Sequence, residues 1–77
     1  MAQPADFYQK KHEALIYLKN DLTVLINTVE NLSNYELKVA DNPDVAVYTK
    51  LIENLRGRKM ALDLPIGNAE RMMHETK

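Results

Sequence analysis

Apolar residues recur with a helical period through the first half of the chain. From Pro4 to Ala40 they follow one another at alternating spacings of three and four residues, which is the heptad pattern of a helix that packs along one stripe. Lys11 and Glu36 are polar interruptions near the two ends of this seam. The pattern predicts a long helix over residues 4–40. Eight apolar residues form its seam: Tyr8, Leu15, Leu18, Leu22, Leu25, Val29, Leu32 and Val39.

Ser33 gives this segment a second interpretation. Ser33 and Glu36 have the spacing of a capping box, in which each side chain bonds to the backbone amide of the other residue at a helix start. A break at Ser33 would divide the long helix into two. The seam continues beyond this point to Val39, so we favour the continuous helix.

Prolines divide the second half of the chain. Pro43 suits the first position of a helix, with Asn42 as its cap. The helical apolar period that follows predicts a second helix over residues 43–63. A break near Pro65 then separates it from a short C-terminal helix over residues 68–76.

The lengths of these segments determine how they pack. A helix over residues 4–40 is about 55 Å long, whereas a compact chain of 77 residues has a radius of gyration of about 11–12 Å. The rest of the chain matches this helix in length, so a turn at Asn42 folds it back along the first half. We therefore predict a single all-α domain over residues 1–77, built as an antiparallel helical hairpin with coiled-coil packing.

The long helix carries more apolar side chains than one neighbouring arm can cover. Between Ala14 and Ile26 several of them lie outside the seam, and an apolar arc of that width needs cover on two sides. A second copy of the chain would supply it, so we expect a homo-oligomer in the form of a helical bundle. The predicted self-association residues are Ile16, Tyr17, Val24 and Ile26.

Composition narrows the classes of function. The chain has no cysteine, two glycines and a net charge of −1. These values exclude a thiolate metal site, a glycine-rich phosphate loop and recruitment of nucleic acid by charge alone. No apolar run approaches the roughly 18 residues that a membrane span needs, and the first residues lack the apolar core of a secretory signal. We therefore expect a cytoplasmic protein that does not contact membranes.

The side chains do not show the arrangement of a catalytic site. The hydroxyl residues lie far from both histidines in the predicted hairpin, and no two carboxylates share an apolar pocket. His12, Glu70 and His74 would meet at the open end as candidate metal ligands, but exposed surface pairs are the commoner role of such residues. We expect no enzymatic activity, no metal and no cofactor.

Basic residues gather at two places. Arg56, Arg58 and Lys59 lie within one helical turn, where either their stems cover the core or their charges contact an anion or an acidic partner. At the open end of the hairpin an aromatic side chain meets two cations, a combination that binds nucleotides or single strands. These residues are Tyr8, Lys11 and Arg71.

Together these patterns predict a small protein-interaction module without catalysis. It would serve as an adaptor, a chaperone or a regulatory inhibitor of bacterial or phage type, with an oligomerising helical hairpin and a protein target that the sequence does not name. The alternative is nucleotide or nucleic-acid binding through one of the basic clusters. Salt would then weaken binding steeply, because cation–phosphate contacts release counterions.

Overall fold

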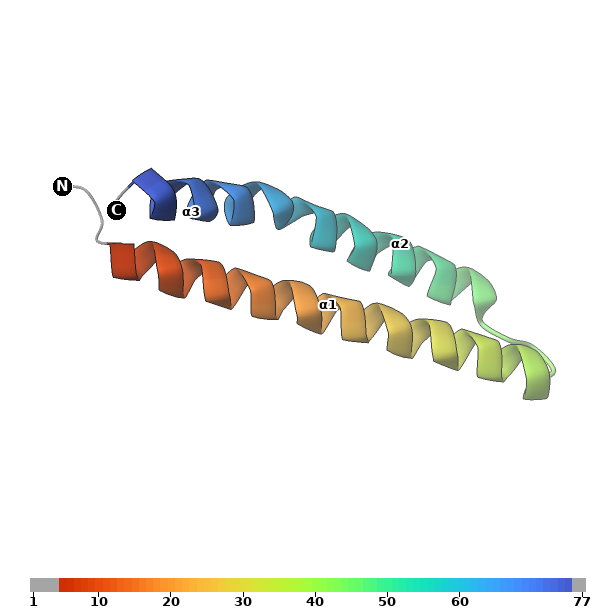
Figure 1. The fold of residues 1–77 in the computed structure, drawn as a ribbon. Coiled ribbons are helices and arrows are strands. Elements are labelled where there is room, and N and C mark those ends of the chain that lie inside the picture. Colours follow the sequence, from red (N-terminus) through yellow and green to blue (C-terminus); the bar gives the residue numbers. More distant parts are fainter. Residues whose placement is uncertain (1–4, 76–77) are drawn as a thin grey trace.

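The computed structural model describes residues 5–75, and nearly all of them are helical (Figure 1). Helix α1 comprises Ala5–Val39, α2 comprises Val45–Ala61 and α3 comprises Asp63–Glu75. No strand occurs among the described residues. The predicted all-α class is therefore confirmed, and the long first helix continues unbroken past Ser33.

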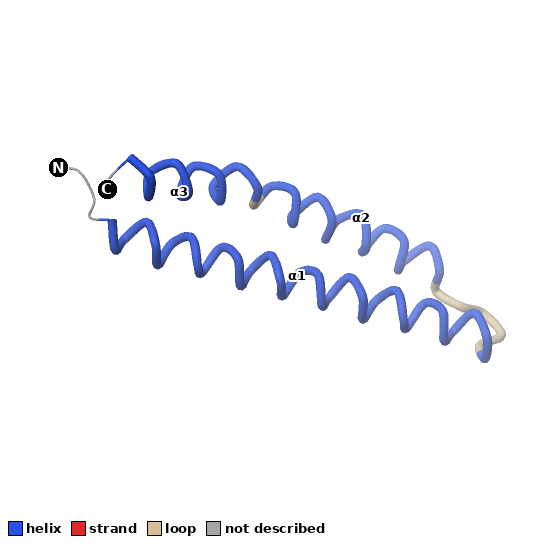
Figure 2. The backbone as a smooth tube through the Cα atoms, viewed as in Figure 1, coloured by secondary structure: helices blue, strands red, loops and turns tan. Residues whose placement is uncertain are grey.

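Helices α2 and α3 form a second arm that lies beside α1 and runs in the opposite direction (Figures 1 and 2). Side-chain contacts fix this register. His12 bonds to Glu70 near the chain ends, and Tyr48 bonds to Glu36 near the turn. The molecule is a rod of 59 × 15 × 14 Å with a radius of gyration of 17.6 Å. Each helix therefore packs along one face only, and its other faces meet solvent.

The second arm begins two residues later than the sequence pattern predicts. Asn42 does not cap it, because residues 40–44 cross from one arm to the other, and α2 begins at Val45 with Asp44 at the N-cap position. Its first backbone bond runs from the Tyr48 amide to the Asp44 carbonyl, 3.1 Å away. The crossing between adjacent arms requires non-helical backbone, and this requirement overrides the local preference of Asn42 for capping.

The third helix begins five residues earlier than predicted and continues the line of α2. At the junction the Leu62 amide bonds to the Lys59 carbonyl at 3.2 Å, a tighter turn than that of an α-helix. Pro65 explains this junction, because it has no N–H for the carbonyl of Ala61 and its ring crowds that carbonyl. Within α3 the missing N–H costs little, because the first four amides of a helix have no intrahelical partner. The second arm is one bent rod, not two separate helices.

The seam of α1 differs from the predicted seam at alternate positions. Leu15, Leu22 and Val29 face the second arm as predicted. The other half of the predicted seam is turned to solvent, and the residues one position later replace it. The exposed residues are Lys11, Leu18, Leu25, Leu32 and Val39, and their replacements are His12, Lys19, Ile26, Ser33 and Ala40.

The second arm explains which of the two seams is used. Polar side chains of the observed seam find partners there, since Lys19 bonds to Asp63 and Glu36 accepts a hydrogen bond from Tyr48. The less exposed side chains of this arm also follow a heptad spacing, which continues through the bend: Val45, Tyr48, Ile52, Leu55, Lys59, Leu62, Ile66, Ala69 and Met73. The core between the arms is small. Within residues 5–75 the buried apolar residues are Ile26, Ile66 and Ala69.

Candidate functional site

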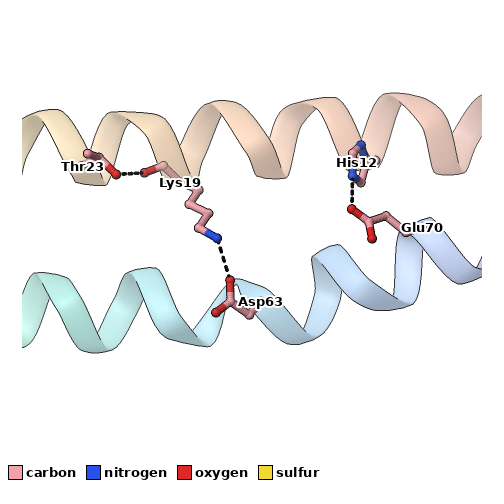
Figure 3. Close-up of polar contacts among 5 residues, drawn as sticks. All are labelled: His12, Lys19, Thr23, Asp63 and Glu70. Carbon is pink, nitrogen blue, oxygen red and sulfur yellow. Dashed lines mark hydrogen bonds and ion pairs between the residues drawn. The ribbon is translucent and has the colours of Figure 1, made fainter.

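One long edge of the paired arms is held by polar contacts, and we call it the polar flank. Three contacts cross between the arms there, each with a nitrogen–oxygen distance of 2.9 Å: His12–Glu70, Lys19–Asp63 and Arg56–Glu30 (the first two in Figure 3). All three pairs are partly exposed, so each contributes at most about 1 kcal/mol to stability. Their main effect is to fix the register of the two arms.

A shallow depression lies in the middle of the polar flank. Its charged lining residues are Lys19, Glu30, Arg56, Lys59 and Asp63. Four of these five are already bonded to one another as cation–carboxylate pairs. Among the described residues no buried side-chain nitrogen or oxygen lacks a hydrogen-bond partner. The depression is therefore typical of an ion-paired edge between two helices.

The opposite long edge is apolar and faces solvent, and we call it the apolar flank. On α1 it consists of residues that each directly precede a seam residue, and Leu51 occupies the matching position on α2. Glu30 and Arg56 each directly follow a seam residue, and they bond to each other across the polar flank. In antiparallel arms the residues that precede the seam residues meet on the opposite edge, so Leu51 lies on the same edge as the row on α1. The side chains of the apolar flank are between 42% and 61% exposed: Leu18, Leu25, Leu32, Val39 and Leu51.

The four residues predicted for self-association do not form one surface. Ile26 is 6% exposed and packs between the arms, because the shift of the seam by one residue turns it inward. Ile16 is half-buried. Tyr17 and Val24 are exposed, and self-association through these two stays a prediction.

The three basic residues predicted as a cluster on α2 have different surroundings. Arg56 reaches across the polar flank to Glu30 at 2.9 Å. Arg58 donates a hydrogen bond to Asn54 of its own helix at 2.8 Å. Lys59 is half-buried in the seam. Arg56 and Arg58 therefore bond to different elements, and binding of an anion or an acidic partner by the three basic residues stays a prediction.

The predicted cluster at the open end is also engaged in local contacts. Tyr8 is half-buried, and its ring lies edge-on against Phe7 with the ring centroids 5.2 Å apart. Arg71 donates to Asn68 at 3.4 Å, and Lys11 is exposed. Binding of a nucleotide or a single strand by Tyr8, Lys11 and Arg71 stays a prediction.

Two findings on residues 5–75 concern metals and membranes. No group of three or more His, Asp or Glu side chains there is arranged to hold a metal ion, and His12 instead bonds directly to Glu70. No helix of this part of the chain combines the length and apolar content needed to cross a membrane.

Tyr48 ties the turn end of the arms together. Its hydroxyl donates a hydrogen bond to the carboxylate of Glu36. Loss of the phenol proton would place a second negative charge beside Glu36. The hydrogen bond to Glu36 therefore raises the pKa of Tyr48 to about 12, with smaller contributions from partial burial and from the charges of Glu36 and Asp44. A phenol with this pKa stays protonated at neutral pH, so the contact is structural.

Some residues of the two flanks are absent from the predicted site residues. Lys19 pairs with Asp63 across the arms, and Glu30 pairs with Arg56. A signal for the polar flank exists in the sequence, because positions 56, 63 and 70 are charged at intervals of seven. The row of the apolar flank also repeats every seven residues in the sequence. A seam between the two arms has the same spacing, so the spacing does not identify this row as a surface.

Comparisons of this chain with protein families, with curated proteins and with solved structures find no match. The function is therefore inferred from the two flanks.

Proposed function

We propose that this chain is a non-enzymatic protein-interaction module that binds its partner through the apolar flank. The observation that carries the proposal is the row Leu18, Leu25, Leu32 and Val39 beside Leu51, all of them substantially exposed. Single exposed leucines are ordinary on protein surfaces, but a contiguous apolar row is typical of an interaction site. Adaptors, chaperones and inhibitors all use surfaces of this kind.

The distribution of apolar residues between core and surface supports this proposal. Thirteen large apolar side chains are exposed within residues 5–75, against three buried apolar residues. The chain retains 5947 Å² of accessible surface, so it buries about 54% of the surface of an unfolded chain of 8.9 kDa. Even a 60-residue domain buries about 60%. A partner that covers the apolar flank would therefore add stability that the paired arms lack.

The polar contacts favour a protein partner over nucleic acid. Arg56 and Arg71, two of the predicted anion-binding cations, already bond to Glu30 and Asn68. Nucleotide binding stays a prediction, which titration with oligonucleotides at low salt tests directly. Binding that weakens steeply with salt would support that alternative.

Site-specific photo-crosslinking in cells that make the protein tests the proposal. A photoreactive phenylalanine analogue replaces Leu25 on the apolar flank or, as a matched control, Asn20 on an exposed side of α1 away from that flank. We expect protein adducts from position 25 and few from position 20. Leu18→Glu combined with Leu32→Glu should abolish the adducts from position 25. Equal yields from both positions, or no adduct from position 25, would contradict the proposal.

A further inference from the structure

We infer that the partner of the apolar flank is a second copy of this chain, with the two copies antiparallel, so that four arms form a helical bundle. This inference rests on the proposed function, because it assigns the occupant of the same surface. Three observations support it: the width of the apolar arc on α1, the surface area that the chain leaves exposed, and the charges at the two ends of the apolar flank.

The apolar arc of α1 covers two adjacent faces. Leu22 and Val29 lie in the seam against the second arm, and Leu25 and Leu32 lie three residues further along, on the apolar flank. Because residues three apart are neighbours on a helix surface, the two rows form one continuous surface. A helix in a two-helix pair needs a single stripe, whereas an arc of this width is typical of a helix with two neighbours, as in a four-helix bundle.

The exposed area matches the needs of one further rod. A compact monomer of 8.9 kDa exposes about 4800 Å², and this chain exposes 5947 Å², which is about 1100 Å² more. A standard protein interface removes about 800 Å² from each partner. The apolar flank extends along α1 from Leu18 to Val39, a length of about 32 Å. A second copy has an apolar flank of the same length and shape.

The charges at the ends of the apolar flank determine the relative direction of the copies. Lys11 precedes Leu18 by seven residues at the open end, and Asp44 precedes Leu51 by seven residues at the turn end. Both side chains are exposed. Antiparallel copies bring Lys11 of each copy toward Asp44 of the other, whereas parallel copies bring like charges together at both ends. Complementary charges therefore favour a two-fold antiparallel pair.

Arg58 is a charged residue within this row, seven residues after Leu51. Its guanidinium donates to the side-chain oxygen of Asn54 on the same helix, which holds the charged head against α2. Its aliphatic stem adds apolar cover to the flank, as long basic side chains commonly do at the edges of helical bundles. Arg58 is therefore compatible with an interface in which its head remains at the solvent edge.

Sedimentation equilibrium of the purified chain tests the association. Over a micromolar concentration range we expect a species of twice 8.9 kDa. Leu18→Glu combined with Leu32→Glu should raise the dissociation constant at least about 100-fold, because carboxylates would be desolvated on both sides of the interface. Asn20→Glu combined with Asn34→Glu adds the same charges at the same spacing on an exposed side of α1 and should leave association unchanged.

Circular dichroism establishes that each variant remains helical. If the glutamate variant loses its helices, Leu18→Ala combined with Leu32→Ala provides the same comparison with residues that favour helix. This alanine variant should also weaken association relative to the parent. A dimer that neither flank variant weakens would overturn the inference.

The relative direction of the copies can be measured with one spin label, because the chain has no cysteine of its own. Glu13→Cys places the label at an exposed position 12 residues from Leu25, which is the middle of the row from Lys11 to Val39. In antiparallel copies centred on Leu25, the arrangement that brings Lys11 toward Asp44, the two labels lie about 36 Å apart along the bundle. Parallel copies would separate them only by the width of the bundle, about 20 Å.

The outcomes separate the inference from the proposed function. A monomer at the highest concentration, or a label distance near 20 Å, overturns the antiparallel second copy. A monomer whose position 25 still crosslinks to a different protein overturns the second copy and leaves the proposed function standing. A monomer without any crosslink from position 25 overturns both.

Discussion

Two adjacent residues, Leu25 and Ile26, distinguish the observed seam from the one that the sequence pattern predicts. Ile26 is 6% exposed between the arms, whereas Leu25 is 49% exposed on the apolar flank. Replacement of a buried isoleucine by alanine costs about 2–5 kcal/mol. The narrow interface between two arms can partly close over the cavity, so we expect about 2–3 kcal/mol for Ile26→Ala. Leu25→Ala removes a half-exposed side chain and should cost about 1 kcal/mol.

Urea unfolding followed by far-UV circular dichroism at the lowest workable protein concentration measures this difference. At that concentration association between copies adds little stability, so the paired arms alone decide the order of the two variants. Both substitutions introduce alanine, which keeps differences in helix propensity small. If Leu25→Ala cost as much free energy of unfolding as Ile26→Ala, the predicted seam would be correct and the observed register wrong. At higher concentration Leu25→Ala should lose further stability, because Leu25 belongs to the proposed interface.

Three further perturbations test other parts of the structure. Gly57→Ala should stabilise α2 by about 1 kcal/mol and raise the Tm by about 4–8 °C, because a Cβ there meets no atom within 4 Å; an unchanged or lower Tm would contradict this. The bond from Tyr48 to Glu36 stabilises the folded chain fully below about pH 10, and this stability is lost as the pH rises toward the folded pKa of about 12. In urea unfolding across this pH range, Tyr48→Phe should therefore remove this part of the decrease in the free energy of unfolding. Arg56→Gln should cost less than about 1 kcal/mol, and high salt should abolish the difference, because the pair with Glu30 is exposed; a salt-independent loss in urea unfolding would show a stronger contact.

The helices themselves follow from local features of the sequence. The alternating apolar spacing defines α1 to within one residue at each end. Local features were less informative at the other boundaries. The start of α2 depends on the distance that the chain must cross between adjacent arms, and this distance exists only in the folded molecule. The start of α3 depends on how far upstream Pro65 disturbs the helix, and the helical turn resumes directly after Leu62.

The seam of α1 could not be predicted from apolar residues alone. Two candidate seams share Leu15, Leu22 and Val29, and they differ in the row that completes them. The row with Leu25 is the more apolar of the two, and the row with Lys19 is the one that faces the second arm. Apolar spacing indicates which side chains require cover, but it does not indicate which neighbour supplies it.

The candidate sites show a related difference between sequence and surface. Successive residues of an α-helix are rotated by about 100°, so side chains that are close in sequence point to different faces. Arg56 and Arg58 are two residues apart and bond to different elements, one to Glu30 on α1 and one within α2. The heptad interval of seven residues predicts a shared flank better than proximity does, as positions 56, 63 and 70 illustrate on the polar flank.

The seam of α1 and its apolar flank differ in the free energy of association that each must supply. The turn at residues 40–44 keeps the two arms of one chain close, so their pairing is intramolecular and a seam with polar residues is sufficient. Separate copies lose translational and rotational freedom when they associate, which requires a larger apolar contribution. The polar seam residues, such as Lys19 with Asp63, favour one register of the arms, because any other register would leave these charges without partners. In the proposed assembly the less apolar seam therefore specifies the fold of each chain, and the more apolar row provides the affinity between chains.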